Sequence, residues 1–295
     1  MNGSGLRRAP DPDVLVEGEY SFTSDDFRTI AALIHEQAGI ALTETKASLV
    51  YSRLAKRVRA LGLVSFAAYC ELLASPEGEV ERGAMLNALT TNVTRFYREP
   101  HHFDHLREEV LKPAIPFLKD GGRMRLWSAA CSSGQEPYSM ALTLLSVLPE
   151  APKLDVKILA TDIDSRILDQ ARAGVYPFDL VSPIPAPQRD RWMRRASNDR
   201  NSWEMGEEVR SLVTFKALNL IGEWPVRGPF DAIFCRNVMI YFDDPTQDRI
   251  CSRFAPLLGA EGRLYIGHSE RVSANVRGLV SDGLTVYRRM EASRP

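Results

Sequence analysis

Polar residues able to bind a ligand stand at several points where short apolar segments end. Trp127–Tyr138 passes from an apolar run into small residues, and Glu136 and Pro137 then open a helix. Small residues let the backbone approach a ligand closely, and proline suits a first helical turn. The segment lacks a G-x-G-x-x-G turn, and Glu136 would repel the pyrophosphate of a dinucleotide. The pattern favours a cationic or zwitterionic nucleoside, with a plain tight turn between strand and helix as the alternative.

An acidic pair ends the next apolar segment, within Ala160–Asp164. A carboxylate at the end of a second strand can accept hydrogen bonds from both hydroxyl groups of a ribose, as in nucleotide-binding α/β folds. Either acid could instead cap the helix that comes next. We expect Asp164 to cap this helix and Asp162 to bind the ribose.

Two further polar pairs follow apolar segments closer to the C-terminus. Phe230–Cys235 is almost wholly apolar and ends in Arg236-Asn237, with Tyr241 shortly after. Polar side chains at the carboxyl end of a parallel strand lie where ligands bind in α/β proteins. Packing alone does not explain an Arg-Asn pair at the end of so apolar a strand. The second pair, Asn219-Leu220, occupies an equivalent place after the preceding strand.

The segment Thr90–Pro100 is rich in hydroxyl and amide donors and also holds Arg95 and Arg98. A solvated helix face usually has more Lys and Glu and less Thr. The segment is therefore a candidate ligand-binding loop, and a polar connection between helices is the alternative.

Three histidines follow this loop, and His101 and His105 have the i, i+4 spacing that could hold a metal. A catalytic zinc site needs three protein ligands, and no third ligand or matching carboxylate is evident. We therefore interpret His101, His102 and His105 as surface histidines at a helix start and expect no metal. No Ser-His-Asp or Cys-His arrangement can be assigned from spacing, so hydrolase chemistry has no positive support.

The elements that must position these residues are of two kinds. Helical spacing predicts four short helices, at about 23–38, 43–61, 65–73 and 79–89, which form a small all-α domain over residues 21–95. Short β-rich runs then alternate with helical ones, which predicts a parallel sheet with helices on both faces over residues 96–291. Residues 1–20 have no period and are expected to be a disordered tail. Residues 176–215 interrupt the alternation and are expected to be an inserted subdomain.

Composition is that of an ordinary globular protein. The 295 residues include 37 Lys plus Arg and 38 Asp plus Glu, and this net charge of −1 argues against a general nucleic-acid binder. Apolar runs are far shorter than the roughly 20 residues that span a bilayer. The N-terminus lacks the apolar core of a signal peptide, so we expect a cytoplasmic protein.

The widely separated cysteines suit neither zinc nor disulfides and are expected to be buried and reduced.

Together these segments resemble the chemotaxis methyltransferases, S-adenosylmethionine-dependent enzymes that methylate glutamates of bacterial chemoreceptors. The likeness extends from about Tyr20 to Arg289. It implies a helical N-terminal domain, a Rossmann-like methyltransferase domain and, in place of the insertion, a β-subdomain that in some members grips a peptide at the receptor's C-terminus. The matching segments are Leu89–Arg98, Trp127–Tyr138, Thr161–Asp164, Asn219-Leu220, Phe230–Phe242 and Gly267–Glu270.

The resemblance also implies roles for individual residues. The cofactor would be S-adenosylmethionine and its product S-adenosylhomocysteine, without a metal. Arg98 and Tyr241 would orient the substrate carboxylate, which needs no general base because a free glutamate, with a pKa of about 4.3, is already ionised at neutral pH. The positions that contact the cofactor in such enzymes are Asn92, Thr94, Arg98, Glu136, Asp162, Asn219, Leu220, Arg236 and Asn237.

The second predicted helix carries five basic residues and no acidic one between Thr45 and Leu63. In the resembling family this basic helix faces the receptor. Arg53, Arg57 and Arg59 are therefore expected to steer and dock the acidic helical bundle of a chemoreceptor, with a solvated helix face as the alternative. Two other functions stay open: a related methyltransferase of a non-chemotaxis signalling pathway, and a non-catalytic S-adenosylmethionine-binding module.

Overall fold

The structure is a computed structural model that describes residues 13–197 and 199–290. The chain forms two compact units, which divide between Thr90 and Thr91. This division falls a few residues before the boundary predicted at residue 95. The predicted end of the second domain, residue 291, lies outside the described residues.

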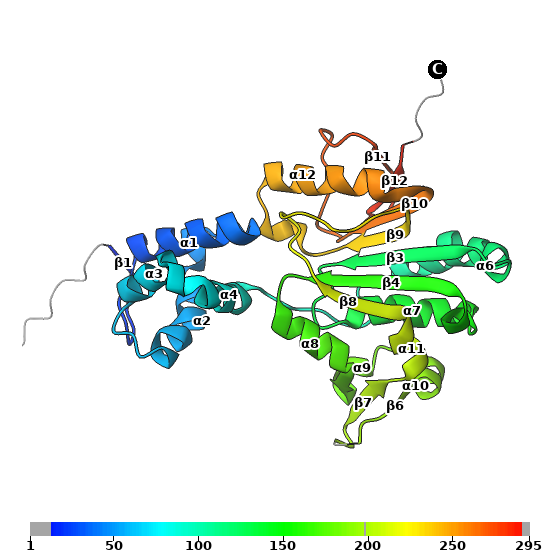
Figure 1. Ribbon diagram of the computed structural model, residues 1–295, viewed down its shortest axis with the longest axis horizontal. Coiled ribbons are helices and arrows are strands. Elements are labelled where there is room, and N and C mark those ends of the chain that lie inside the picture. The colour runs from blue at the N-terminus through cyan, green and yellow to red at the C-terminus, as the bar shows by residue number, and fades with distance from the viewer. Residues whose placement is uncertain (1–12, 198, 291–295) are drawn as a thin grey trace, which may run out of the picture. The chain divides into compact units, whose positions relative to one another are not determined.

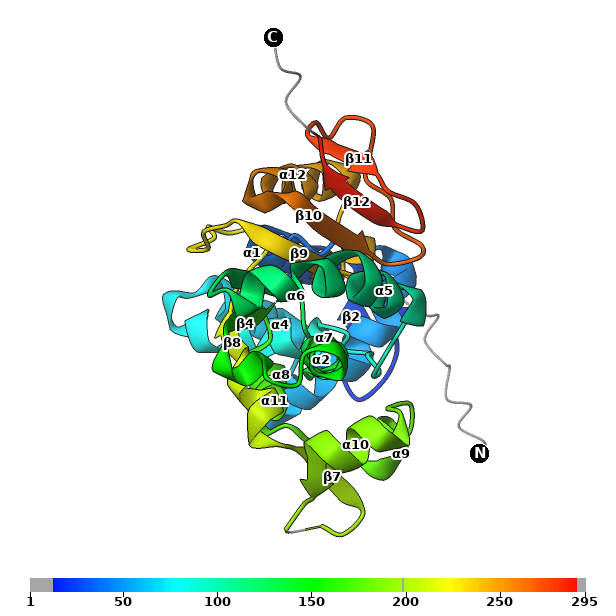
Figure 2. The same ribbon diagram turned by 90° about the vertical axis from the view of Figure 1, so that its right-hand side faces the viewer.

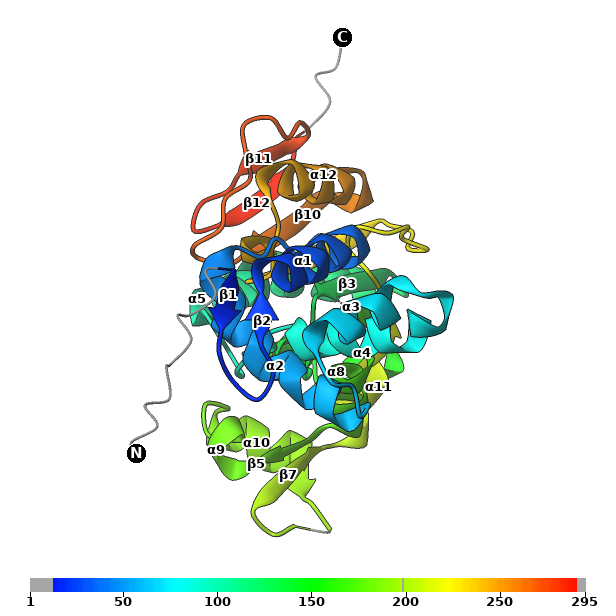
Figure 3. The same ribbon diagram turned by 90° about the vertical axis from the view of Figure 1, so that its left-hand side faces the viewer.

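The first unit is helical, as its apolar spacing predicts (Figure 3). Its first helix begins with the expected capping pair: the Thr23 side chain accepts a hydrogen bond from the Asp26 backbone N–H, and the Asp26 carboxylate accepts one from the Thr23 backbone. The elements are β1 (Val14–Val16), β2 (Phe22–Thr23), α1 (Ser24–Ala38), η1 (Glu44–Lys46), α2 (Ala47–Ala60), α3 (Phe66–Ala74), η2 (Pro76–Gly78) and α4 (Glu79–Leu89).

Regular structure begins before Thr23. The strand β1 pairs antiparallel with β2, and the ring of Tyr20 packs edge-on against that of Phe66. The prediction of a disordered tail is therefore wrong for residues 13–20: β1 pairs with a strand only a few residues later, and Tyr20 packs against a ring that is distant in the chain, so composition alone does not reveal this order. Residues 1–12 lie outside the described residues.

A seven-stranded sheet forms the second unit. Its strands are β3 (Arg123–Ala129), β4 (Asp155–Asp162), β8 (Val213–Ala217), β9 (Phe230–Cys235), β10 (Leu258–Ile266), β11 (Leu279–Ser281) and β12 (Val286–Arg289). They lie in the order β11-β12-β10-β9-β3-β4-β8, which Figure 1 shows from β12 to β8. The five strands from β10 to β8 are parallel, and β12 runs antiparallel to both of its neighbours. The predicted α/β fold with a central parallel sheet is thereby confirmed.

Helices cover both faces of this sheet. Alternate residues of a strand point to opposite faces, so Leu126 of β3 joins one apolar core with Leu144, while Trp127 joins the other with Phe254. The helical segments are α5 (Pro100–His105), η3 (Leu106–Leu111), α6 (Lys112–Lys119), α7 (Gln135–Val147), η4 (Ala151–Lys153), α8 (Ser165–Ala173), η5 (Met239–Tyr241), α12 (Asp244–Phe254) and η6 (Ala255–Leu257).

The insertion forms a three-stranded antiparallel sheet in the order β5-β7-β6, with short helices beside it (Figure 2). The predicted range of 176–215 extends too far, because its last residues belong to β8 of the main sheet, where Val213 pairs with Ile158. Its elements are β5 (Val175–Pro177), α9 (Phe178–Val181), α10 (Ala186–Trp192), β6 (Met193–Arg195), β7 (Ser202–Met205) and α11 (Glu207–Leu212).

One long helical segment was not predicted from the sequence pattern. It runs from Pro100 to Lys119, and its middle part, η3, has π-helical hydrogen bonding. Pro113 and Pro116 lie within it, and prolines ordinarily indicate a helix boundary. Among the described residues, none of the helices is long and apolar enough to cross a membrane.

Candidate active site

The candidate residues gather along the carboxyl edge of the parallel strands. Glu136 follows β3, Asp162 ends β4, and Arg236-Asn237 follows β9. From β3 the chain proceeds to β4 and β8 on one side, and it returns to β9 and β10 on the other. The edge between β3 and β9 is therefore the topological switch point, where ligands bind in open α/β sheets.

Arg236 lies at this switch point with its side chain only 1% exposed. Its Nη1 donates to Glu136 Oε2 at 3.0 Å, and its Nη2 lies 3.1 Å from Glu99 Oε2 and donates to the carbonyl oxygen of Arg98. The hydroxyl of Ser128 donates to the other oxygen of Glu136 at 2.7 Å. A buried charge is tolerated when it is paired and hydrogen-bonded. This network therefore holds the ends of β3 and β9 against the segment that precedes α5.

The two carboxyl groups respond differently to their surroundings. Burial alone would raise the pKa of Glu99, but the charge of Arg236 and the hydrogen bond from His268 outweigh it and lower that pKa to about 2. Burial raises the pKa of Glu136, and Arg236 and Ser128 offset only part of this effect. A positive charge beside Glu136 would favour its ionised form. The site is therefore suited to a cationic ligand.

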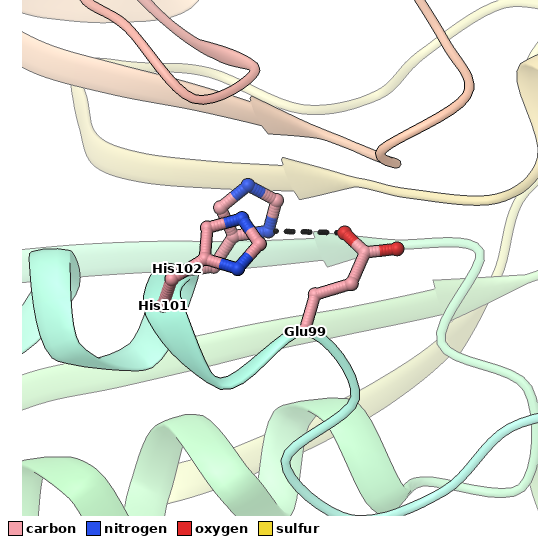
Figure 4. Close-up of side chains that lie close together, drawn as sticks. All are labelled: Glu99, His101 and His102. Atoms are coloured by element: carbon pink, nitrogen blue, oxygen red, sulfur yellow. Dashed lines mark ion pairs between the residues drawn. The ribbon is translucent and has the colours of Figure 1, made fainter.

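Glu99, His101 and His102 lie together at the start of α5, and their possible ligand atoms are within 4.8 Å of one another (Figure 4). The prediction of surface histidines is wrong for His102, which is fully buried. Its Nε2 lies 3.0 Å from the carbonyl oxygen of Leu284, and its ring packs edge-on against Tyr265. Burial lowers the pKa of His102 to about 4, so the ring is neutral at pH 7.

The oxygens of Glu99 are already engaged by protein groups. Oε2 faces Arg236, and Oε1 accepts a hydrogen bond from Nδ1 of His268 at 3.0 Å. A metal bound to Oε2 would lie close to the guanidinium group and be repelled by it. This donor set fits an ion-pair network better than a metal site, and the expectation of no metal stays a prediction.

Asp162 and Asp164 both take part in local hydrogen bonding. Asp164 caps α8 as predicted, since its Oδ1 accepts from the Arg166 backbone N–H at 3.0 Å, and its Oδ2 accepts from the Asn92 amide at 3.1 Å. Asp162 is buried, and its oxygens accept from the backbone N–H groups of Ser132 at 2.8 Å and Asp164 at 3.0 Å. Each carboxylate oxygen can accept more than one hydrogen bond. Asp162 can therefore still accept ribose hydroxyls, and that role stays a prediction.

The turn after β3 connects these residues to the rest of the unit. The Ser132 hydroxyl donates to the carbonyl oxygen of Asn92 at 3.2 Å, and Tyr176 of the insertion donates to that of Ser133 at 2.7 Å. The φ angles of Ala130 and Ser132 are positive, at 72° and 50°. Such a conformation costs a non-glycine residue about 1 kcal/mol or more, so the surrounding contacts must hold it.

The two residues after β8, Asn219 and Leu220, have different surroundings. The side-chain oxygen of Asn219 accepts from the Ile221 backbone N–H at 3.1 Å. The side chain of Leu220 is buried in the core with Trp224 and Phe254. Any contact of Leu220 with a ligand is therefore expected to involve its backbone.

Thr94, Arg98 and Tyr241 are all half-buried. Arg98 donates from Nη1 to the carbonyl oxygen of Val93 at 2.9 Å, while its own carbonyl oxygen accepts from Arg236. Tyr241 ends η5, directly after the segment that contains Arg236. A contact of these three residues with cofactor or substrate stays a prediction.

In the helical unit, two of the arginines predicted to dock a receptor bind residues of one neighbouring helix, α4, or of its C-terminal end. Arg53 donates from Nη1 to the carbonyl oxygens of Leu89 at 2.7 Å and Thr90 at 2.9 Å, at the end of α4. Arg57 forms a two-pronged ion pair with Glu81 of α4, a carboxylate that is 7% exposed. Both arginines therefore stabilise the packing of α2 against α4.

The third arginine, Arg59, is exposed and pairs with the exposed Glu19. The helix α2 has no acidic residue of its own, but other elements supply its acidic partners. These partners, Glu81 and Glu19, could not be seen by counting the residues of one helix, and receptor docking by the three arginines stays a prediction.

Several residues of the site were missed in the sequence. Glu99, His268 and Ser128 complete the Arg236 network, yet Glu99 and Arg236 are far apart in the chain and only the fold unites them. Like these three residues, Glu270 lies in a segment quoted above but was given no role. Its buried carboxylate accepts hydrogen bonds from three backbone N–H groups, one of them that of Asn237.

Comparison with known proteins identifies the family of the chain. The family model of the CheR methyltransferase SAM binding domain matches residues 92–285, and that of the CheR methyltransferase all-alpha domain matches residues 25–90. A probable chemotaxis protein methyltransferase of Rhizobium etli is 52% identical, over 87% of this chain and 96% of its own length. Chemotaxis protein methyltransferase 2 of Pseudomonas aeruginosa is 44% identical, over 91% and 94%. The chemotaxis protein methyltransferase of Escherichia coli is 43% identical, over 88% and 89%.

The two family models together extend over most of the chain, and they meet where the helical unit gives way to the sheet unit. The carboxyl edge of the sheet, with its buried carboxyl groups, lies within the part matched by the SAM binding domain. The chain therefore belongs to the CheR methyltransferase family, as its motifs indicate, and is an S-adenosylmethionine-dependent methyltransferase.

Proposed function

We propose that this protein transfers the methyl group of S-adenosylmethionine to glutamate side chains of chemoreceptors. The observation that carries the proposal is the buried Arg236 network at the switch point of the sheet, in a chain whose relatives are chemotaxis protein methyltransferases. The acceptor is expected to be the cytoplasmic helical bundle of a receptor. A receptor C-terminal peptide at the insertion is a second expected contact.

The residues of the site fit a cationic nucleoside. Two carboxyl groups, Glu99 and Glu136, face one guanidinium group, so a further positive charge would be stabilised there. Within the described part of the chain, the buried Nε of Arg236 has no hydrogen-bond acceptor. Glu136 and Asp162 are the groups expected to hold the cofactor. When bound, S-adenosylmethionine supplies an activated methyl group on a cationic sulfur.

The protein's own task in this reaction is mainly positioning. A glutamate carboxylate is ionised at pH 7 and is already a nucleophile, so no side chain needs to remove a proton from it. Opposite charges disappear during the transfer, so excluding water from the reacting groups favours it. Arg98 and Tyr241 are expected to orient the carboxylate through single hydrogen bonds. A two-pronged Arg–carboxylate pair would weaken the nucleophile.

Incubation with methyl-labelled S-adenosylmethionine and a receptor cytoplasmic fragment tests this function. We expect label in the receptor as a methyl ester, which mild base releases as methanol because esters hydrolyse under conditions that leave N-methyl groups intact. Substitution of the receptor's methylated glutamates by alanine should abolish the label. Base-stable label would contradict glutamate as the acceptor. Absence of label with retained S-adenosylhomocysteine binding would favour a non-catalytic binding module.

Asp162→Ala should weaken the binding of S-adenosylhomocysteine by about 1.5–3 kcal/mol, the range for hydrogen bonds to a charged group. Isothermal titration calorimetry measures this change. Asp169→Ala is a matched control, since Asp169 is an exposed acid of the following helix, paired with Arg172. Equal affinity of the folded Asp162 variant and the control would remove Asp162 from the cofactor site.

Tyr241→Phe should lower kcat for receptor methylation about tenfold, the effect of one hydrogen bond that forms in the transition state. Its affinity for S-adenosylhomocysteine and its unfolding temperature should stay near those of the wild type. Tyr287→Phe is the control, because the Tyr287 hydroxyl accepts from the Val272 backbone N–H, outside the candidate site. A wild-type kcat for the Tyr241 variant would rule out its role in turnover.

Receptor docking can be tested at the ion pair between Arg59 and Glu19, because substitutions of its two members should change KM for the receptor in opposite directions. An exposed pair contributes at most about 1 kcal/mol, so a receptor carboxylate can compete with Glu19 for Arg59. Arg59→Gln should therefore raise KM for the receptor, and Glu19→Gln should lower it, both without effect on cofactor affinity. The difference should shrink near 0.5 M salt, where screening is within a few Å.

Arg57→Ala is the comparison for this pair of variants. It leaves the carboxylate of Glu81 without its guanidinium partner, so the main loss should be stability, of about 2 kcal/mol, as for hydrogen bonds to a charged group. Thermal unfolding measures this loss of stability.

If both changes at the Arg59–Glu19 pair leave KM unaltered at low salt, α2 is a solvated face and the docking role is wrong.

A further inference from the structure

Glu270 lies just beyond the end of β10, and its side chain is among the few acidic groups buried in the sheet unit, with 4% of the residue exposed. Its Oε2 accepts from the backbone N–H of Gly267 at 2.6 Å and from that of Asn237 at 2.9 Å. Its Oε1 accepts from the backbone N–H of Met239 at 2.8 Å. One carboxylate therefore joins the segment after β10 to the segment after β9.

The segment after β9 adopts a conformation that needs such support. Asn237 has a φ of 58°, in the left-handed region that non-glycine residues occupy only when their surroundings hold them. Its neighbour Arg236 carries the ion pairs with Glu99 and Glu136. The position of the Asn237 backbone therefore affects where the guanidinium group lies.

Gly267 allows the two segments to approach closely. A Cβ atom at this position would lie 2.5 Å from Asn237 Nδ2, 2.9 Å from the Asn237 backbone nitrogen and 2.8 Å from Glu270 Oε2. These distances are shorter than ordinary contacts, so any other residue would push Asn237 and Glu270 apart. The absence of a side chain at Gly267 and the carboxylate of Glu270 thus serve the same arrangement.

We propose that Glu270 is a positioning residue for the cofactor site, which it serves by holding the Arg236-Asn237 backbone in its left-handed conformation against Gly267. It acts through these residues and does not itself touch the reacting groups. The proposal rests on the function proposed above and adds a residue to which no role has been given.

Glu270→Gln tests the proposal with little change of size. A carboxamide has one acceptor oxygen and one NH₂ group, so at least one of the three backbone N–H groups would face another donor. We expect the dissociation constant for S-adenosylhomocysteine to rise about tenfold, as for one lost hydrogen bond at a buried group. Calorimetry well below the unfolding temperature separates this effect from a loss of folded protein.

Gly267→Ala disturbs the same contact between Asn237 and Glu270 by adding a Cβ atom beside both residues. It should raise the dissociation constant for S-adenosylhomocysteine by a similar factor. Because both changes break one arrangement, the double variant should be scarcely worse than either single variant. The matched control is Asp231→Asn, at the opposite end of β9, where Asp231 Oδ2 accepts from the Arg125 backbone N–H at 2.8 Å. It should lower the unfolding temperature and leave the dissociation constant unchanged.

Wild-type affinity of the Glu270 and Gly267 variants, or effects that add in full in the double variant, would overturn the proposal. Should Glu270→Gln not fold, the affinity of Gly267→Ala decides alone. If instead the wild-type chain binds no S-adenosylhomocysteine, the proposed function fails, and the wild-type titration reveals this before any variant is compared.

Discussion

The pairing of one buried guanidinium group with two carboxyl groups is the interaction on which the site depends. Arg236 cannot remain buried without Glu99 and Glu136. Glu136 follows β3, Glu99 lies in the segment before α5 and Arg236 follows β9, so satisfying the charge of Arg236 brings these three segments together. An electrostatic requirement of a single side chain thereby determines the geometry of the ligand-binding edge.

The sheet makes this requirement possible because its two faces are packed separately. Strand residues that alternate between two apolar cores keep water away from both sides of β3 and β9. Charged groups just beyond the ends of these strands are therefore flanked by dry protein, where electrostatic interactions are stronger than in water. The same burial raises the pKa of Glu136, and Arg236 and Ser128 offset only part of that rise.

The sequence predicted the features that depend on interactions between residues close together in the chain. The capping pair of Thr23 and Asp26, the helix capped by Asp164 and the apolar strand at Phe230–Cys235 all depend on neighbours within a few residues. The partners of Arg236, Arg57 and Arg59 could not be predicted in this way. Each lies on another element, and only the folded chain brings the two together. The burial of His102 was missed for the same reason, because Leu284 and Tyr265 are distant in sequence.

The hydrogen bond from Tyr176 to Ser133 bears on how the chain could be divided or recombined. The insertion looks like an addition to a complete sheet, with its own strands and helices. Yet Tyr176 in its first strand donates a hydrogen bond to the carbonyl oxygen of Ser133, in the turn after β3. The preceding residue of that turn, Ser132, donates its backbone N–H to Asp162. Replacing the insertion by a short loop would remove that donor and leave a strained turn less supported. The insertion and the candidate site are therefore not independent modules, and an exchange of insertions between relatives must preserve this tyrosine to keep the turn intact.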